Sequence, residues 1–226
     1  MRTAPVEIGG ARVRQVDETT CGSACLLMLA ATGDSRVMQW LETGECEGIL
    51  PPEVPPGRYA NADERIAAAQ WRIQRHSVQR GVGPAKWPKS LGTPPWTAAR
   101  DARFPGVRYL HRAVSDRGAR GEQMTSQLVN ALRRGYPVLL YTGGDTRGGA
   151  TTALPRHVVL AVPGSRPRVT TDGDEVISIY EPSAGLVYEV PISELRDRTT
   201  PHTALGHWTH IQWLVLPVPA SKEGMS

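Results

Sequence analysis

The sequence predicts an α+β protein in which helices precede an antiparallel sheet along the chain. Residues 19–33 are rich in Ala, Leu and Met and apolar nearly all round, which predicts a buried helix. From residue 136 onward, short segments rich in β-branched and aromatic residues alternate with Gly, Pro and Asp turns, which predicts strands. We therefore expect one domain over residues 1–226, with a helical lobe at about 1–135 and a sheet lobe at about 136–218.

The helical lobe is expected to contain several short elements. In order they are an irregular or extended lead-in at 1–17, helices at 19–33, 61–75, 96–103 and 121–134, and a strand at 107–113. The first helix has a Thr cap at position 19 or 20, and Gly33 is a natural residue to follow its end. An insertion at 44–106 opens with a loop that carries four prolines. Its tryptophans Trp87 and Trp96 fit either the wall of a cleft or the filling of core or surface.

The sheet lobe is expected to consist of five strands. They are predicted at 136–142, 157–162, 175–180, 186–190 and 208–218. The loops at 143–150 and 164–173, which are rich in Gly and polar residues, are expected to be flexible.

Composition and charge argue against several classes of function. The formal net charge is +4 and the pI is about 9.2, but the basic residues are dispersed, which does not fit a nucleic-acid-binding surface. No stretch approaches the roughly 18 apolar residues of a membrane helix, and the first residues lack the apolar core of a signal peptide. We therefore expect a cytoplasmic protein without a membrane span. No G-x4-G-K-[ST] motif occurs, and no cofactor is expected.

Cys21 is the candidate nucleophile. It lies at the start of the first predicted helix, where the positive end of the helix dipole and free N–H groups favour a thiolate. The backbone N–H of Cys21 can also donate to an oxyanion that forms when the sulfur attacks a carbonyl. Gln15 lies six residues upstream, and an extended segment would let its amide supply a second donor. The alternative for Cys21 is a buried structural thiol, since free cysteine is often buried.

The other two cysteines are expected to have structural roles. Cys25 lies one turn further along the same apolar helix and should face the core. An odd number of cysteines does not fit a disulfide framework. A zinc site formed by Cys21, Cys25 and Cys46 is disfavoured because the C-x2-C spacing of structural zinc sites is absent and no histidine lies nearby.

A cysteine nucleophile needs a base, which usually lies far away in the sequence. Of the six histidines, His157 is the first choice, because it opens an apolar strand and would be held rigidly at the rim of a cleft. The runner-up pair is His207 and His210.

A carboxylate should orient the imidazole of the base through its other nitrogen. Glu181, at the end of the next predicted strand, is the leading candidate if the two strands are neighbours. Asp172 and Asp174 are weaker candidates because the glycine between them indicates a turn.

Four short motifs, in this order, resemble those of a known family. They are Gln15-x5-Cys21-Gly22, Pro137-Val138-Leu139-Leu140, His157-Val158-Val159 and Tyr180-Glu181-Pro182-x-x-Gly185. The chain resembles the C39-like branch of papain-fold cysteine peptidases, which includes the domains that cut bacteriocin leader peptides after a double glycine. The resemblance is good at 12–33 and 127–191 and poor at 44–106.

The resemblance implies a papain-like fold, with the nucleophile helix packed on an antiparallel sheet. It also implies Cys21 as nucleophile, His157 as general base and acid, Gln15 as oxyanion donor, and a carboxylate or amide in third place. The chain departs from the family at that third place, where the family commonly has Asp and this sequence has Glu181.

The function expected from these residues is that of a thiol hydrolase. It would cleave a peptide or isopeptide bond in a peptide or protein substrate through a thioester on Cys21. The same thioester resolved by an amine would make the chain a transpeptidase or acyltransferase, and a catalytically silent peptide-binding module is the alternative from another class. Relatives are often fused to a transporter, but the sequence contains neither a membrane span nor a P-loop from which coupling to export could be inferred.

Overall fold

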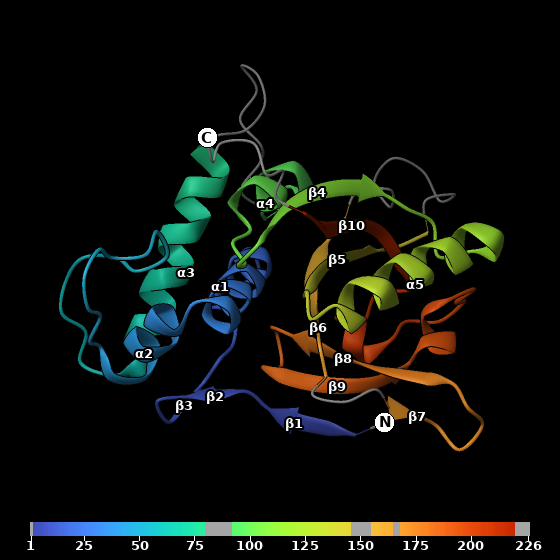
Figure 1. Cartoon of the computed structure of the whole chain (residues 1–226), viewed down its shortest axis with the longest axis horizontal. Coiled ribbons are helices and arrows are strands. Elements are labelled where there is room, and N and C mark those ends of the chain that lie inside the picture. The colour runs from blue at the N-terminus through green and yellow to red at the C-terminus, as the bar shows by residue number, and fades with distance from the viewer. Residues whose placement is uncertain (1, 80–91, 146–154, 165–167, 220–226) are drawn as a thin grey trace.

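The structure is a computed structural model that describes residues 2–79, 92–145, 155–164 and 168–219. Over these residues it is a mixed α+β fold with five α-helices and a large antiparallel sheet (Figure 1). The helices are α1 (Cys21–Gly33), α2 (Ser35–Thr43), α3 (Ala62–Gln79), α4 (Pro95–Asp101) and α5 (Gly118–Arg133), with short 3-10 turns η3 (Ile192–Leu195) and η4 (Thr203–Leu205).

The large sheet has the strand order β1-β9-β8-β6-β5-β10-β4, and β7 pairs with β8 beside this path. Its strands are β1 (Thr3–Pro5), β4 (Val107–Ala113), β5 (Val138–Gly143), β6 (His157–Val162), β7 (Arg168–Val169), β8 (Glu175–Glu181), β9 (Leu186–Pro191) and β10 (His210–Pro219). The small hairpin of β2 (Glu7–Ile8) and β3 (Ala11–Arg12) leads toward α1. The sheet therefore draws strands from both ends of the chain, including β1 and β4 from the range expected to form the helical lobe.

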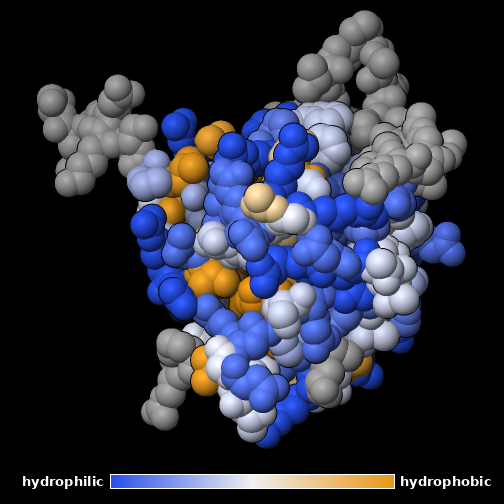
Figure 2. All heavy atoms as spheres, turned by 90° about the vertical axis from the view of Figure 1, so that its right-hand side faces the viewer, coloured by the Kyte–Doolittle hydropathy of each residue, from blue (hydrophilic) through white to orange (hydrophobic). Residues whose placement is uncertain are grey.

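Helices cover both faces of the sheet, and side chains that alternate along each strand contribute to a hydrophobic core on either face. In β5, Leu139 and Tyr141 belong to the core cluster that contains α1, whereas Val138 and Leu140 belong to the cluster that contains α5. In Figure 1, α1, α2 and α3 gather on one side of the molecule and α5 lies on the other. Figure 2 shows that the surface on the α5 side is largely hydrophilic, with hydrophobic residues in small separate groups.

The expected helices at 61–75, 96–103 and 121–134 are confirmed within a few residues as α3, α4 and α5, and the five strands of the sheet lobe are present. The buried helix at 19–33 is also confirmed, since eleven of the thirteen residues of α1 are buried. Helix α2 was not predicted from the sequence. The Asp34 side chain caps this helix by accepting from the N–H of Arg36, and Gly44 ends it with a φ of 84°. Its buried residues Val37, Trp40 and Leu41 share one face, so the sequence held the signals.

The lead-in and loops also differ in detail from the expectation. The lead-in at 1–17 pairs as β1, β2 and β3, and β7 lies within the loop expected at 164–173. Residues 146–154 and 165–167 of the two loops expected to be flexible lie outside the described residues, as does Trp87. None of the described helices is both long enough and apolar enough to cross a membrane.

Strand register brings four strand ends to one end of the sheet. His157, the first residue of β6, is paired with Thr142 near the end of β5. Gly143, the last residue of β5, is paired with His210, the first residue of β10. Because β6 and β8 are antiparallel, the end of β8 at Glu181 lies at the same end of the sheet as the start of β6. Two of the residues predicted from sequence to form the site, His157 and Glu181, therefore lie at the same end of the sheet.

Candidate active site

Cys21 is the first residue of α1 and is 3% exposed. A turn precedes it, in which the Thr20 hydroxyl donates to the Asp17 carbonyl oxygen at 3.0 Å and accepts from the Asp17 N–H at 2.9 Å. The Thr20 hydroxyl does not cap α1. The sulfur thus lies at the positive end of the helix, where the N–H groups of the first turn have no partner within the helix.

Two glutamines of α3, one turn apart, hold the segment that leads into α1. Gln70 is fully buried, and its amide donates to the Arg14 carbonyl oxygen at 2.7 Å and accepts from the Val16 N–H at 3.1 Å. Gln74 donates to the Thr19 hydroxyl at 2.6 Å and to the Thr19 carbonyl oxygen at 3.3 Å. Gln70 therefore holds the backbone on either side of Gln15.

Gln15 is half-buried and lies beside the turn that follows β8. Its backbone N–H donates to the Pro182 carbonyl oxygen at 2.9 Å, and its side-chain oxygen accepts from the Ser183 hydroxyl at 3.0 Å. Its side-chain nitrogen donates to the Asp17 carbonyl oxygen at 2.8 Å. An amide nitrogen has two hydrogens, so one donor remains beyond the bond to Asp17.

His157 and Glu181 form a buried pair. Nε2 of His157 lies 2.7 Å from Oε1 of Glu181, and the two residues are 7% and 3% exposed. The Glu181 carboxylate also accepts from the N–H groups of Ser183 at 2.9 Å and Ala184 at 2.7 Å. Because an ionised carboxylate only accepts, Nε2 carries a proton, and Nδ1 is the ring nitrogen that makes no bond to this carboxylate.

The surroundings of the pair raise the pKa of His157 and lower the pKa of Glu181, so both shifts favour the charged forms. Burial lowers the pKa of His157, but the hydrogen bonds with Cys21 and Glu181 and their negative charges outweigh this and raise it to about 9. Burial raises the pKa of Glu181, but the bonds from His157 and from the N–H groups of Ala184 and Ser183 outweigh this and lower it below its usual value. A protonated imidazole beside an ionised carboxylate is therefore the favoured state near neutral pH.

Glycine lets backbone approach the reactive side chains closely. Gly206 follows η4 with a φ of 66°, and a Cβ added there would lie 2.2 Å from Cδ2 of His157. A Cβ added at Gly22, next to the nucleophile, would lie 2.7 Å from Cβ of Thr93. A Cβ at Gly92 would lie 3.9 Å from Sγ of Cys21. Backbone of the loops before α4 and after η4 thus packs directly on the site.

Cys25 faces the core, as expected. It is fully buried, and its thiol donates to the Val158 carbonyl oxygen at 3.4 Å. Burial, with the nearby charges of Cys21 and Glu181, raises the pKa of the Cys25 thiol well above its usual value. The structure therefore keeps this thiol in a form that reacts poorly.

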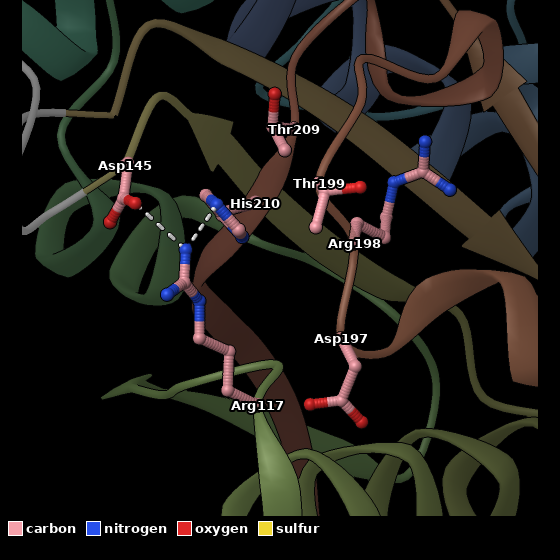
Figure 3. Close-up of a pocket in the computed structure, with 7 residues that line it drawn as sticks. All are labelled: Arg117, Asp145, Asp197, Arg198, Thr199, Thr209 and His210. Atoms are coloured by element: carbon pink, nitrogen blue, oxygen red, sulfur yellow. Dashed lines mark hydrogen bonds and ion pairs between the residues drawn. The ribbon is translucent and has the colours of Figure 1, made fainter.

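The runner-up histidines lie in other settings. His210 is bound by Asp116, whose carboxylate oxygens are both 3.1 Å from Nδ1, and by Arg117, whose Nη2 is 2.8 Å from Nε2. Figure 3 shows Asp145, two residues after the end of β5, and His210 of β10 converging on this Arg117 guanidinium. His207 is exposed, with a φ of 63°. Both ring nitrogens of His210 are thus committed to a network of their own.

The alternative acids have other partners. The Asp174 carboxylate accepts from the N–H and the hydroxyl of Ser193 at 3.1 and 2.6 Å, and its backbone forms the turn with Thr170. Asp172 is exposed in the same turn.

Trp96 packs edge-on against His111 of β4, with the ring centroids 6.4 Å apart. In the described part of the chain, no group of three or more His, Cys, Asp or Glu side chains has the arrangement of a metal site.

Three residues that hold the site together were not predicted from the sequence. Gln70 and Gln74 had a weak signal only, as two polar residues four apart in a helix with a buried face. Gly206 had the signal of a glycine after a short turn, but nothing in the sequence indicates that its backbone contacts His157.

Comparison of the chain with models of known protein families finds no match, and comparison with curated proteins finds none either.

Proposed function

We propose that the chain is a thiol-dependent enzyme with a papain-like fold that cleaves a peptide or isopeptide bond through a thioester on Cys21. The observation that carries the proposal is the 2.7 Å contact between His157 and Glu181, which leaves the other imidazole nitrogen for a cysteine at the start of a buried helix. A buried structural thiol needs neither a histidine with a raised pKa beside it nor a carboxylate behind that histidine.

The reaction follows from the protonation states of these groups. The Cys21 thiolate attacks the carbonyl carbon of the substrate, and the carbonyl π electrons move to the oxygen to give a tetrahedral oxyanion. Collapse of this intermediate breaks the C–N bond, and the protonated imidazole of His157 gives its proton to the departing amine. Neutral His157 then takes a proton from water, whose oxygen attacks the thioester; the C–S bond breaks, a carboxylic acid leaves, and the Cys21 thiolate is restored beside the protonated imidazole. Glu181 stabilises the imidazolium that forms in this cycle.

The oxyanion has two candidate donors. One is the backbone N–H of Cys21, which lies in the first turn of α1 and has no partner within the helix. The other is the second hydrogen of the Gln15 amide, whose backbone is held between Gln70 and Pro182. Donors fixed in this way stabilise developing charge without a cost of reorganisation at the moment of reaction.

The resemblance to C39-like peptidases and these contacts together support a peptide or protein substrate. The longer carboxylate at the third position is accommodated because Glu181 folds back to accept from two N–H groups of its own turn as well as from His157. The departure from the common Asp therefore leaves the histidine with a carboxylate partner.

The test uses a thiol-directed acyl electrophile and measures intact mass, so it needs no knowledge of the substrate. Wild type and Cys25→Ala should each gain one acyl group, and Cys21→Ala should gain none at the same dose. Release of the acyl group over time in wild type, slowed in His157→Ala, would show turnover of the thioester. Faster release on adding an amine would assign acyl transfer instead of hydrolysis. Stable acylation at Cys25 or Cys46, or equal labelling of Cys21→Ala, would refute the proposal.

A further inference from the structure

A cavity separate from the thiol site lies between α1, α3, α4 and the loop before α3. Its volume is about 320 Å³. Leu26 of α1 and Ile73 of α3, both core residues, supply apolar lining, and Pro52 of the loop lies beside them. A small cavity with an apolar floor and a few polar groups at its rim is the usual form of a site for a small organic ligand.

The acidic groups of this cavity already have basic partners. Glu53 is bound by the guanidinium of Arg103 through two hydrogen bonds, at 2.9 and 2.8 Å. Asp101 is bound by Arg100 at 2.9 Å and accepts from the Ser77 hydroxyl at 3.1 Å. Their negative charges are therefore largely neutralised within the wall of the cavity.

Two basic side chains of α3 at the rim have no carboxylate partner among the residues that the structure describes. Arg72 donates Nε to the Pro52 carbonyl oxygen at 2.6 Å, and among the described residues it makes no bond to a carboxylate. His76 lies four residues further along α3, on the same side of the helix, and lines the same cavity. The bond to Pro52 orients the guanidinium and leaves both Nη groups for an anion.

We propose that this cavity binds a small organic acid, with one carboxylate held by Arg72 at the rim and a compact apolar body seated on Leu26 and Ile73. The carboxylate meets a guanidinium whose charge no acid in the wall offsets, and His76 adds donor capacity beside it. The apolar body replaces water over core side chains, which favours binding independently of the charge. This site is independent of the proposed thiol chemistry, because it depends on none of Cys21, His157 and Glu181.

The proposal is tested with 4-phenylbutyrate as the probe and 4-phenylbutanamide as its uncharged counterpart. Titration of the full chain is followed by calorimetry, and the position of binding by shifts of backbone amide signals in NMR spectra. Phenylbutyrate should bind wild type saturably and shift the amides of Leu26, Ile73 and His76. The amide should bind roughly tenfold more weakly or worse, because it lacks the charge-assisted bonds to Arg72.

Arg72→Gln should weaken phenylbutyrate binding by a similar factor, whereas Arg75→Gln should leave it unchanged. Arg75 is the matched control, because it is an exposed arginine on the same helix that does not line the cavity. Absence of saturable binding to wild type, equal affinity for acid and amide, or amide shifts confined to another part of the chain would each overturn the proposal. The comparison of acid with amide on wild type decides the matter even if Arg72→Gln fails to fold.

Discussion

Oε1 of Glu181 accepts a hydrogen bond from Nε2 of His157 at 2.7 Å, in a setting where both side chains are almost completely buried. The two residues are 24 positions apart and meet because β6 and β8 are antiparallel neighbours. This contact fixes the ring orientation of His157 and favours its protonated form.

Removing the charge of Glu181 should change the pH dependence of Cys21 alkylation. Without the carboxylate, the pKa of His157 falls toward its ordinary value, so a thiolate paired with an imidazolium is favoured over a narrower pH range. Glu181→Gln should move the alkaline limb of the pH–rate profile to lower pH, and Glu181→Ala should cost more because the ring also loosens. Glu122→Gln, at an exposed carboxylate on α5, should reproduce the wild-type profile. An unchanged profile in Glu181→Gln would exclude the carboxylate from this role.

Protonation of His157 should also contribute to stability. Folding raises its pKa from about 6.5 to about 9, so this contribution is fully present below pH 6.5 and is lost as the pH rises through 9. At 1.36 kcal/mol per pKa unit its upper bound is roughly 3 kcal/mol. Urea unfolding of wild type and His157→Gln at pH 6, 8 and 10 measures it, and the stability difference between the two should shrink as the pH increases. A difference that is constant with pH would contradict the raised pKa.

Gln15→Ala should lower kcat by about 10²–10³ with little change in KM, the effect expected when one oxyanion donor is removed. The reason is that the amide would act on the charge that develops in the transition state and not on the bound substrate. Gln39→Ala, at an exposed glutamine of α2, is the matched control and should be silent. Unaltered turnover of Gln15→Ala would remove this residue from the mechanism.

Gln70 should matter for stability. Gln70→Leu leaves the Arg14 carbonyl and the Val16 N–H without their partner, at about 1–3 kcal/mol for each group that stays buried. Gln70→Glu keeps the acceptor for Val16 but loses the donor to Arg14 and buries a carboxylate there, so it should be at least as destabilising as Gln70→Leu. Chemical denaturation gives the stabilities. Equal stability of Gln70→Leu and wild type would mean that the two bonds do not hold the lead-in.

Gly206→Ala should impair activity through His157 while the fold is retained. The new Cβ would fall 2.2 Å from the imidazole ring, so the ring or the turn must move. Gly173→Ala is the control, because Gly173 also has a positive φ, of 82°, but nothing lies within 4 Å of an added Cβ. Both variants carry similar backbone strain, and only Gly206→Ala should alter the pH–rate profile of Cys21. Matching profiles for the two variants would contradict the packing role of Gly206.

The sequence was sufficient to predict the elements that carry the site. Composition located the helix that starts at Cys21, and an apolar run located the strand that starts at His157. The expected Thr cap was wrong, because the Thr20 hydroxyl bonds within the preceding turn, and Gly33 is the last residue of the helix and does not follow it. The pairing of His157 with Glu181 was predictable because it requires only that consecutive long strands be neighbours.

Contacts between distant segments could not be predicted in the same way. Gln70 meets Arg14 across 56 positions, and Gly206 meets His157 through a turn whose path no local pattern specifies. The helix α2 was missed for a different reason, since its Asp34 cap and its Gly44 end were visible but were not combined with the apolar spacing between them.

The most direct test of the central claim is competitive alkylation with limiting iodoacetamide at pH 6, followed by peptide mapping of the three cysteines. At this pH an ordinary thiol is almost wholly protonated and reacts slowly, whereas a cysteine beside a protonated imidazole reacts through its thiolate. Cys21 should be labelled first although it is 3% exposed, ahead of the more accessible Cys46, and this preference should be lost in His157→Ala. Preferential labelling of Cys46 or Cys25 in the wild-type protein would contradict the assignment of Cys21 as the nucleophile.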